Sequence, residues 1–299
     1  MNTSPSGRPR SRPVRACGLA ALLLYCGFVN AYVITTEPGD NAPLPEGTDL
    51  GVLYYQHAER NKLMVNGHEA RPDVKLNSDI VLARYVKWTS LAGFLVTPQV
   101  IVPWGHLSMS GDSHGSESAF GDPFIGSNVW LYNDFEKERY FSLGGYVGIP
   151  LGHYDGSQGA MNIGENRWKG VLEINYVHAL IARTLYAEIT LERDWFGEND
   201  DYLGGTLKQS PAFEVQTHLR YVINPANQIG LTYIHTTGAE NHYDDQALGD
   251  SLNTGRYLLT WAHFLTPKTQ LQTQIGQDLE VRNGLEEKAR LNVRLAHVF

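Results

Sequence analysis

Apolar and polar residues alternate along many short segments of this chain. The clearest examples are residues 185–194, 213–221, 270–281 and 289–296, where apolar side chains occupy nearly every second position. Successive side chains of a β-strand point to opposite faces, so this period of two predicts strands with one apolar and one polar face. A helix would scatter the carboxylates of these segments around its whole circumference.

The same pattern, applied to the whole chain, predicts about twelve strands and an all-β fold. The predicted strands are residues 49–59, 73–87, 91–103, 123–133, 138–150, 167–178, 183–196, 211–222, 227–237, 256–265, 269–281 and 288–299.

The connections between these strands alternate in length. Long polar segments at 60–72, 104–121, 151–166, 197–210 and 238–255 alternate with tight turns near 89–90, 134–137, 182–183, 224–226 and 266–268. Long loops at one end and short turns at the other are typical of a closed, antiparallel transmembrane β-barrel. An even strand count then places both termini at the short-turn, periplasmic end. The competing fold, a soluble β-sandwich, does not require long loops on one side.

Hydropathy is compatible with a barrel. The mean hydropathy is −0.29, and no apolar run reaches the roughly 18 residues that a spanning helix needs. Strands that alternate escape such averages. Twelve strands predict a lumen between that of small filled barrels and that of open porins, hence a narrow one.

The first 31 residues have the composition of a cleaved secretory signal peptide. Four arginines (Arg8, Arg10, Arg12 and Arg15) precede an apolar run, and Val29-Asn30-Ala31 supplies small residues before the cut. We therefore expect residues 1–31 to be removed and residues 32–299 to form the barrel domain. Both cysteines, Cys17 and Cys26, lie in the removed part. A lipidated Cys26 is the less favoured alternative, because the bulky Tyr25 precedes it.

The remaining chain is acidic. Removing the four arginines leaves 20 basic and 32 acidic side chains, a formal charge of −12, which argues against a nucleic-acid partner. The expected partners are outer-membrane lipids, the barrel assembly machinery of a Gram-negative bacterium, and a small-molecule solute. The terminal Phe299, at the end of an alternating strand, is the candidate assembly signal.

Charged residues on the polar faces of the strands are the candidates for the lumen wall. They could select a solute, or they could only brace the interior through ion pairs such as those expected between the last two strands. The candidates are Glu173, Glu188, Glu192, Glu214, Arg220, Asp278, Glu280, Arg290 and Arg294. Asp278 and Glu280 are expected to pair with Arg290 and Arg294.

Four aromatic residues are candidates for contact with a ring-bearing solute: Phe124, Trp130, Tyr132 and Tyr146. The alternative is that they belong to the aromatic belts at the membrane interfaces. Gly144, Gly145 and Gly148 in the next segment indicate a bend or a close backbone approach.

No motif of an enzyme, metal centre or cofactor site is found. There is no G-x-S-x-G, P-loop, dinucleotide fingerprint or H-E-x-x-H pattern. The alternation offers no outward Ser–His pair with a helper residue, so no catalytic residue is assigned. The acidic loop groups at 198–201 and 242–245 could bind a cation, although solvated loops are the simpler interpretation. We expect no cofactor.

Three motifs resemble an outer-membrane family known as the meta-pathway of phenol degradation. They are Gly121-Asp122-Pro123, the stretch from Pro150 to Asp155, and the stretch from Asn162 to Trp168. The resemblance implies a barrel that transports aromatic or other hydrophobic compounds. The expected function is therefore facilitated diffusion of small molecules. The alternatives are a structural or adhesive barrel and, less favoured, an outer-membrane lipid hydrolase.

Overall fold

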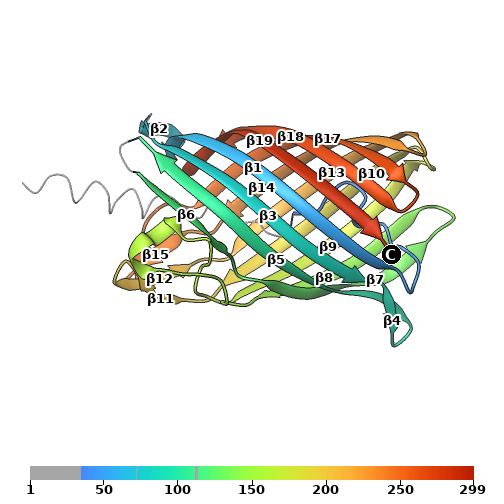
Figure 1. Cartoon of the computed structure of the whole chain (residues 1–299), viewed down its shortest axis with the longest axis horizontal. Coiled ribbons are helices and arrows are strands. Elements are labelled where there is room, and N and C mark those ends of the chain that lie inside the picture. The colour runs from blue at the N-terminus through green and yellow to red at the C-terminus, as the bar shows by residue number, and fades with distance from the viewer. Residues whose placement is uncertain (1–34, 72, 112–113) are drawn as a thin grey trace, which may run out of the picture.

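Twelve long strands form a closed barrel (Figure 1). The computed structural model describes residues 35–299 except residues 72, 112 and 113. The expected signal peptide, residues 1–31 with both cysteines, lies outside the described residues. The barrel strands are β1 (Asp49–Val65), β3 (Lys75–Lys87), β5 (Phe94–Ser110), β7 (Phe124–Asp134), β8 (Arg139–Gly148), β9 (Lys169–Ile181), β10 (Leu185–Phe196), β13 (Ala212–Asn224), β14 (Asn227–Gly238), β17 (Leu252–Thr266), β18 (Thr269–Val281) and β19 (Gly284–Val298).

Antiparallel pairing closes the barrel. Each barrel strand pairs with its neighbours in the sequence, and β19 pairs with β1 from Leu50 opposite Val298 to Met64 opposite Gly284. Every strand therefore has a partner on both edges, as a sheet surrounded by hydrocarbon requires. The predicted twelve-stranded antiparallel barrel is confirmed.

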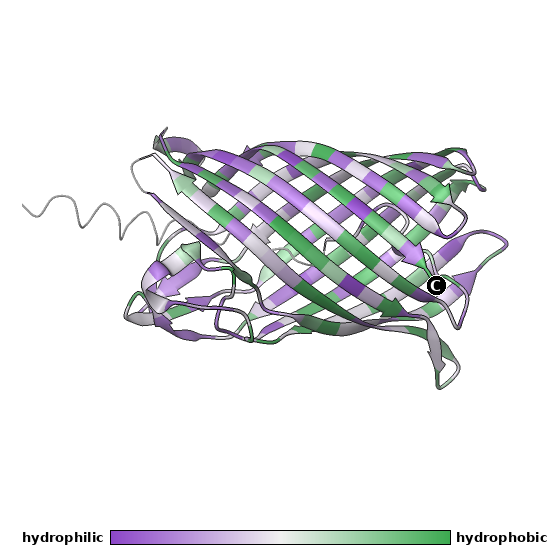
Figure 2. Ribbon diagram, in the orientation of Figure 1, coloured by the Kyte–Doolittle hydropathy of each residue, from purple (hydrophilic) through white to green (hydrophobic). Residues whose placement is uncertain are grey.

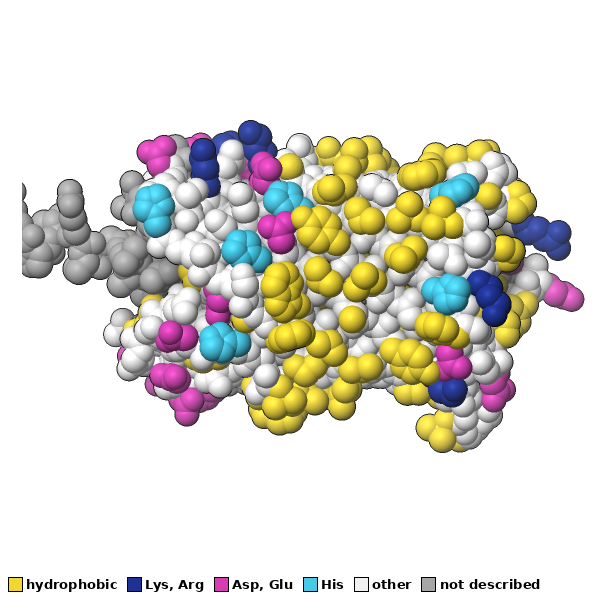
Figure 3. Space-filling model, in the orientation of Figure 1, with side chains coloured by type: hydrophobic (Ala, Val, Ile, Leu, Met, Phe, Trp, Pro, Cys, Tyr) yellow, Lys and Arg dark blue, Asp and Glu magenta, His cyan; other side chains and the backbone are white. Residues whose placement is uncertain are grey.

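The outer surface is apolar around its middle. Hydropathy alternates along each strand (Figure 2). Leu291 and Leu295 on β19 are 37% and 42% exposed on the outer face. Asn292 and Arg294, which lie between them in the sequence, are buried. Hydrophobic side chains cover the middle of the face shown in Figure 3, and charged and histidine side chains gather nearer its two ends. Such a band suits the hydrocarbon layer of a bilayer.

Among the described residues, no helix has the length and apolar character needed to cross a membrane.

The two ends of the barrel differ. At one end, the short-turn end, β7–β8, β9–β10, β13–β14 and β17–β18 are joined by connections of a few residues, and β4 (Thr89–Leu91) extends a hairpin. The C-terminus lies there, where Phe299 N–H donates to the carbonyl of Asp49 (3.0 Å). The other end, the long-loop end, carries the longer connections, except that residues 282–283 alone join β18 to β19. The predicted alternation is thus present.

The predicted long loops are largely strand. β1 and β5 run on to Val65 and Ser110, and the connections contain β2 (His68–Arg71), β6 (Gly115–Phe120) and the short 3₁₀ helix η1 (Gly156–Met161). A separate small sheet consists of β11 (Asn199–Tyr202), β12 (Gly205–Gln209), β15 (Asn241–Tyr243) and β16 (Gln246–Ala247). The prediction of polar loops was wrong here because strand pairing continues beyond the apolar band, where both faces can be polar.

A hydrophobic cluster fills the barrel at the long-loop end. Met161 and Ile163, from the connection between β8 and β9, pack with the buried Leu76, Leu107 and Met109 of the strand extensions. The connection therefore folds inward over the barrel.

One close approach in the wall explains a glycine. A Cβ on Gly144 of β8 would lie 2.6 Å from Asn128 Oδ1 and 2.8 Å from Glu173 Oε2, whereas a Cβ on the outward Gly145 would meet nothing within 4 Å. We expect Gly144→Ala to destabilise the barrel by about 1–3 kcal/mol through overpacking. Thermal unfolding in detergent measures this, with Gly145→Ala as the matched control. Equal unfolding midpoints for the two variants would contradict the close approach.

Candidate functional site in the barrel lumen

A short segment without strand structure enters the barrel from the short-turn end. In residues 35–44, the N-terminal segment, Asp40 N–H donates to the carbonyl of Glu37 (2.9 Å) and Ala42 N–H to that of Gly39 (3.2 Å). Gly39 has φ +98°, a left-handed conformation that glycine adopts without a Cβ penalty. The resulting turn holds the segment inside the barrel.

Amides from the barrel wall bind the N-terminal segment. Thr36 Oγ1 donates to Gln216 Oε1 of β13 (2.7 Å), and Gln272 Nε2 of β18 donates to Glu37 Oε2 (2.8 Å), as does Gln274 Nε2. The three glutamines are at most 2% exposed. Buried amides without partners are costly, so the segment satisfies groups that would otherwise face an empty lumen.

Sequence reasoning missed this segment. Its signal was available: residues 32–48 lack alternation and contain Pro38, Pro43 and Pro45. The pattern marks the stretch as non-strand but says nothing about where it goes.

Burial raises the pKa of the Glu37 carboxyl to about 8. The positive charge of Arg294 and the amides of Gln272 and Gln274 act in the opposite direction, and the carboxylate of Asp40 adds to the rise. Glu37 belongs to the N-terminal segment rather than to a spanning strand.

One wall of the lumen carries a row of carboxylates. Glu192 of β10 lies directly opposite Glu173 of β9 and Glu214 of β13 in the strand register. All three are at most 3% exposed, and within the described part of the chain none of them forms an ion pair. Glu173 Oε1 and Glu214 Oε1 have no hydrogen-bond partner. Like charges opposite one another repel, so this wall is strongly acidic when ionised.

The opposite wall carries two arginines. Arg294 is on β19, six strands from β9 in the barrel order, and Arg84 is on β3, six strands from β13. Asp40 of the N-terminal segment lies between them, with Oδ1 2.9 Å from Arg294 Nη2 and Oδ2 3.6 Å from Arg84 Nη1. The carboxylates and the two arginines thus lie on opposite sides of the lumen, because six strands separate them in a barrel of twelve.

Most of the charged lumen candidates are inward or paired. Arg220 Nε lies 2.7 Å from Glu188 Oε1, and Arg290 Nε lies 2.6 Å from Glu287 Oε1. The residues that lie buried on the inner face are Glu173, Glu188, Glu192, Glu214, Arg220, Asp278 and Arg294, and Arg290 is half-buried. A role for them in solute passage stays a prediction.

Two of the expectations about charged residues were wrong. Glu280 is exposed, because the register of β17 and β18 shifts by one residue at Leu279, which turns both Leu279 and Glu280 outward. The expected pairs between β18 and β19 do not form. Asp278 Oδ1 instead lies 2.8 Å from Arg256 Nε across the β17–β18 pair, and Arg294 pairs with Asp40.

A buried ionic cluster lies in the wall nearer the long-loop end. Glu287 is fully buried, and its carboxylate lies 2.8 Å from Arg60 Nη2, 2.6 Å from Arg290 Nε and 3.4 Å from Arg256 Nε. Asp278 supplies the second carboxylate. The cluster joins β1, β17, β18 and β19.

Three of the four aromatic candidates face the lumen and one faces outward. Phe124, Trp130 and Tyr146 are 3–4% exposed on the inner face, so they do not form a membrane-interface belt. Tyr132 is 47% exposed and bonds to Asp134 on the outer surface. Its outward position agrees with the alternative, an aromatic belt, rather than with solute contact in the lumen, because a register shift at Leu131 inverts the faces of β7 beyond that residue.

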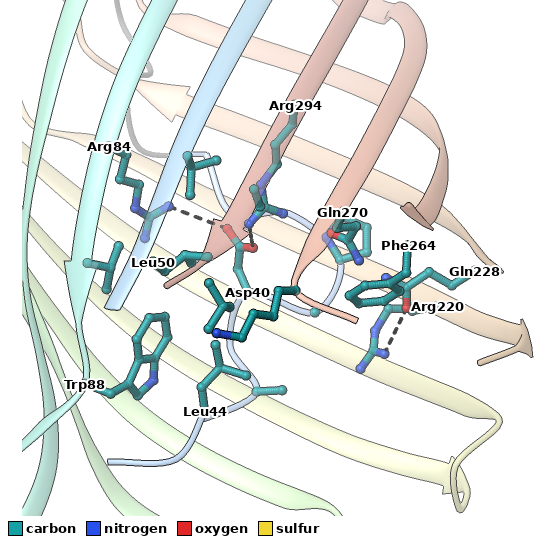
Figure 4. Close-up of a pocket in the computed structure, with 18 of the residues that line it drawn as sticks. Asp40, Leu44, Leu50, Arg84, Trp88, Arg220, Gln228, Phe264, Gln270 and Arg294 are labelled. Carbon is teal, nitrogen blue, oxygen red and sulfur yellow. Dashed lines mark hydrogen bonds and ion pairs between the residues drawn. The ribbon is translucent and has the colours of Figure 1, made fainter. Parts of the chain in front are cut away.

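A chamber lies at the short-turn end, beside the N-terminal segment (Figure 4). Its volume is about 410 Å³. Its wall combines the arginines Arg84, Arg220 and Arg294 with apolar and aromatic side chains, among them Trp88, Trp130 and Phe264. Trp130 Nε1 donates to the carbonyl of Asn41 at 3.4 Å.

The three sequence motifs meet at one carboxylate. Asp122 Oδ1 accepts from Gly152 N–H (2.9 Å) and Oδ2 from Glu165 N–H (2.8 Å). Burial raises the pKa of Asp122 even though both amides favour its ionised form. Burial acts to raise the pKa of Glu165 too, but the charges of Lys169 and Arg167 outweigh it and hold that pKa below its usual value.

An outward Ser–His pair is present after all. His106 Nδ1 of β5 lies 2.6 Å from Ser118 Oγ of β6, on the outer surface. Asp79 lies opposite His106 in the β3–β5 register, but its Oδ1 is engaged by Tyr55 Oη (2.6 Å) and His57 Nδ1 (2.8 Å). The predicted strand 91–103 ends before His106, and both residues of the pair lie in the segment 104–121 that the sequence predicts as a loop.

The acidic loop groups show no metal-ligand arrangement. No group of three or more His, Cys, Asp or Glu residues in the described ranges is placed to hold a metal ion. Asp245 Oδ1 lies 2.8 Å from Lys208 Nζ, and Asp244 Oδ1 accepts from the backbone of Thr206.

Comparison with known proteins decides the family. The family model described as "Putative MetA-pathway of phenol degradation" matches residues 61–295. The chain belongs to this family. The resemblance seen in the three motifs is confirmed, and Asp122, Gly152 and Glu165 all lie within the matched range.

A solved structure of an outer membrane channel resembles this member of the phenol-degradation family along most of its length. The channel, from Pseudomonas putida F1, is 32% identical, with a TM-score of 0.85, over 89% of this chain and 100% of that one. No curated protein matches the chain.

Two autotransporter barrels share only the fold with this family member. The transport unit of AIDA-I from Escherichia coli has a TM-score of 0.56 at 9% identity, covering 96% of this chain and 98% of that one. The translocator domain of NalP from Neisseria meningitidis has a TM-score of 0.52 at 10% identity, covering 88% and 92%.

Proposed function

We propose that the protein is an outer-membrane channel for facilitated diffusion of small aromatic or otherwise hydrophobic molecules. The observation that carries this proposal is the 410 Å³ chamber inside a closed barrel, whose wall combines apolar and aromatic side chains with arginines. The N-terminal segment lies beside the chamber, and in this proposal it moves aside when a solute passes. Membership in the phenol-degradation family and the 32% identical outer membrane channel support the proposal.

The proposal includes an orientation and partners. The long-loop end would face outward and the short-turn end the periplasm, with cleavage of residues 1–31 after export. Outer-membrane lipids would cover the apolar band. Phe299, 70% exposed at the end of the last strand, would be available to the barrel assembly machinery.

Purified protein in planar bilayers tests the channel. We expect single-channel currents that small aromatic solutes such as benzyl alcohol and benzoate reduce, and that glucose leaves unchanged. Labelled benzoate should also enter protein-containing vesicles faster than empty ones. Failure to exceed empty vesicles, together with no channel current, would contradict the proposal.

The pKa of Glu37 predicts a pH dependence of the current. The bound segment retains its proton up to about pH 8, whereas a released carboxyl ionises near its ordinary value. Binding of the segment is therefore fully favoured below about pH 4.5 and weakens as the pH rises towards 8. Tyr54, Arg294 and Asp40 are the other titratable or charged groups interacting with Glu37.

We expect the mean current to rise between pH 4.5 and 8, and Glu37→Gln to flatten this dependence because the amide does not titrate. Single-channel recording over this range measures the effect. Identical pH profiles for the two proteins would show that Glu37 does not control the segment.

A structural or adhesive barrel is the alternative that the occupied lumen favours, since such a barrel need not open. A protein that conducts neither intact nor with the segment released would support it.

The Ser118–His106 pair favours a third candidate, an outer-membrane lipid hydrolase. Its 2.6 Å contact is the geometry of a nucleophile and base. Release of fatty acid from phospholipid vesicles, abolished by Ser118→Ala, would support a hydrolase; equal release by both proteins would exclude this pair as the site.

A further inference from the structure

The chamber at the short-turn end has a strong excess of positive charge. Arg84, Arg220, Arg294 and Lys268 line it, and Asp40 is the one carboxylate among its lining residues. Arg220 is already satisfied by Glu188 on the adjacent strand. Asp40 is thus the shared counter-ion of two arginines, Arg84 and Arg294.

Asp40 fills this position incompletely. Its Oδ1 makes a close contact with Arg294 Nη2 at 2.9 Å, but its Oδ2 is 3.6 Å from Arg84 Nη1 and has no hydrogen-bond partner. Arg294 Nε is also buried without a partner. Guanidinium groups bind carboxylates best through two parallel hydrogen bonds, and the segment's turn does not deliver that geometry.

The remainder of the chamber suits a flat apolar body. Trp88, Trp130 and Phe264 contribute aromatic faces, and Leu44 and Val86 contribute aliphatic ones. A volume of about 410 Å³ is at the small end of ligand pockets, which suits a single ring or a short chain. Figure 4 shows Arg84 and Arg294 converging on Asp40, with Trp88 and Leu44 nearby.

We propose that the chamber binds small carboxylates with an aromatic or aliphatic body, and that the ligand carboxylate replaces Asp40 between Arg84 and Arg294. Because Asp40 belongs to the N-terminal segment, its displacement frees that segment from the arginine wall. Binding of the solute would thereby loosen the N-terminal segment that obstructs its passage. This inference rests on the proposed channel function and adds the substrate class and the means of release.

Charge determines which class of solute can replace Asp40. A cation would meet two arginines, and a neutral hydrocarbon would leave them paired with Asp40 and the segment in place. Only an anion competes for the same contacts. The carboxylates of Glu173, Glu192 and Glu214 on the opposite wall would orient such an anion toward the arginines.

Binding to the full mature protein in detergent tests the proposal, with the fluorescence of the chamber tryptophans as readout. We expect benzoate to bind at least about tenfold more tightly than benzyl alcohol or benzylamine, since a charged hydrogen bond is worth more than the neutral one. Arg294→Gln should weaken benzoate binding by about tenfold. Asp40→Asn should strengthen it several-fold, because the competitor is gone.

Lys137→Gln is the matched control, since it removes an exposed positive charge that pairs with Asp134 in the β7–β8 turn and does not line the chamber. It should leave benzoate binding unchanged. Equal affinities for benzoate and benzyl alcohol, or no gain in Asp40→Asn, would overturn the proposal.

A second measurement does not depend on the folding of the charge variants. Both cysteines, Cys17 and Cys26, lie in residues 1–31, so in the protein lacking these residues Ala42→Cys in the N-terminal segment gives a single thiol. We expect benzoate, but not benzyl alcohol, to increase its rate of reaction with a maleimide. Equal rates with both solutes would contradict displacement by a carboxylate. Passage of neutral aromatic solutes without binding of benzoate would support the channel function and contradict this inference. Passage of no solute would contradict the channel function itself.

Discussion

Deleting residues 35–44 is expected to raise the single-channel conductance several-fold. The N-terminal segment occupies the lumen and is bound by Gln216, Gln272 and Arg294 from three strands. Its removal replaces these contacts with water and leaves the barrel wall intact, because every barrel strand keeps both partners. The measurement is the distribution of conductance steps in planar bilayers.

Glu46→Gln is the control for this deletion. Glu46 lies just beyond the segment and bonds to Ser90 on the exposed surface, so its conductance should equal that of the intact protein. Folding of the deletion variant is checked by its electrophoretic mobility without heating, which should equal that of the intact barrel. A folded variant with unchanged conductance would show that the obstruction lies elsewhere.

Glu287→Ala is expected to cause the largest loss of stability. Its carboxylate is the centre of the cluster with Arg60, Arg256 and Arg290, and it is fully buried. Removing one partner of a buried ion pair typically costs about 3–5 kcal/mol, because the remaining charges are left uncompensated. Thermal or urea unfolding in detergent measures the change.

The adjacent Glu286→Ala provides the comparison. Glu286 is partly exposed and lies 3.7 Å from Lys62 on the surface, where ion pairs contribute about 1 kcal/mol at most. Both variants lose one glutamate from β19. Similar unfolding midpoints would mean that the cluster does not stabilise the barrel.

The strand pattern predicted the barrel because period two is imposed by physics at every strand. A lipid-facing side chain must be apolar and its neighbour must face the lumen, so residues such as Leu291 and Arg294 reveal their faces directly. Twelve strands, their order and the difference between the two ends follow from the same alternation.

Single-residue shifts escaped the pattern. Bulges at Leu131 and Leu279 add one residue to one strand of a pair, which reverses every face beyond them, and they turned Tyr132 and Glu280 outward. Ion-pair partners also depend on the register between neighbouring strands, which alternation does not determine. Asp278 therefore forms its ion pair with Arg256 rather than with Arg290.

The lumen contents were the hardest to predict. The inward candidates Glu173 and Arg294 were named from alternation alone. The N-terminal segment was not, because its place in the barrel depends on contacts with residues more than a hundred positions away, such as Gln216 and Gln272.

The seam between β1 and β19 has a consequence for how the molecule is made. Every other neighbouring pair joins strands adjacent in the barrel order and close in the chain, so the ribbon can grow one hairpin at a time. The seam alone joins the two ends of the sheet and therefore bears the greatest loop-closure entropy. The β1–β19 pair should therefore form last. Glu37 and Asp40 must lie inside the barrel before this pair forms, or enter afterwards through the short-turn end.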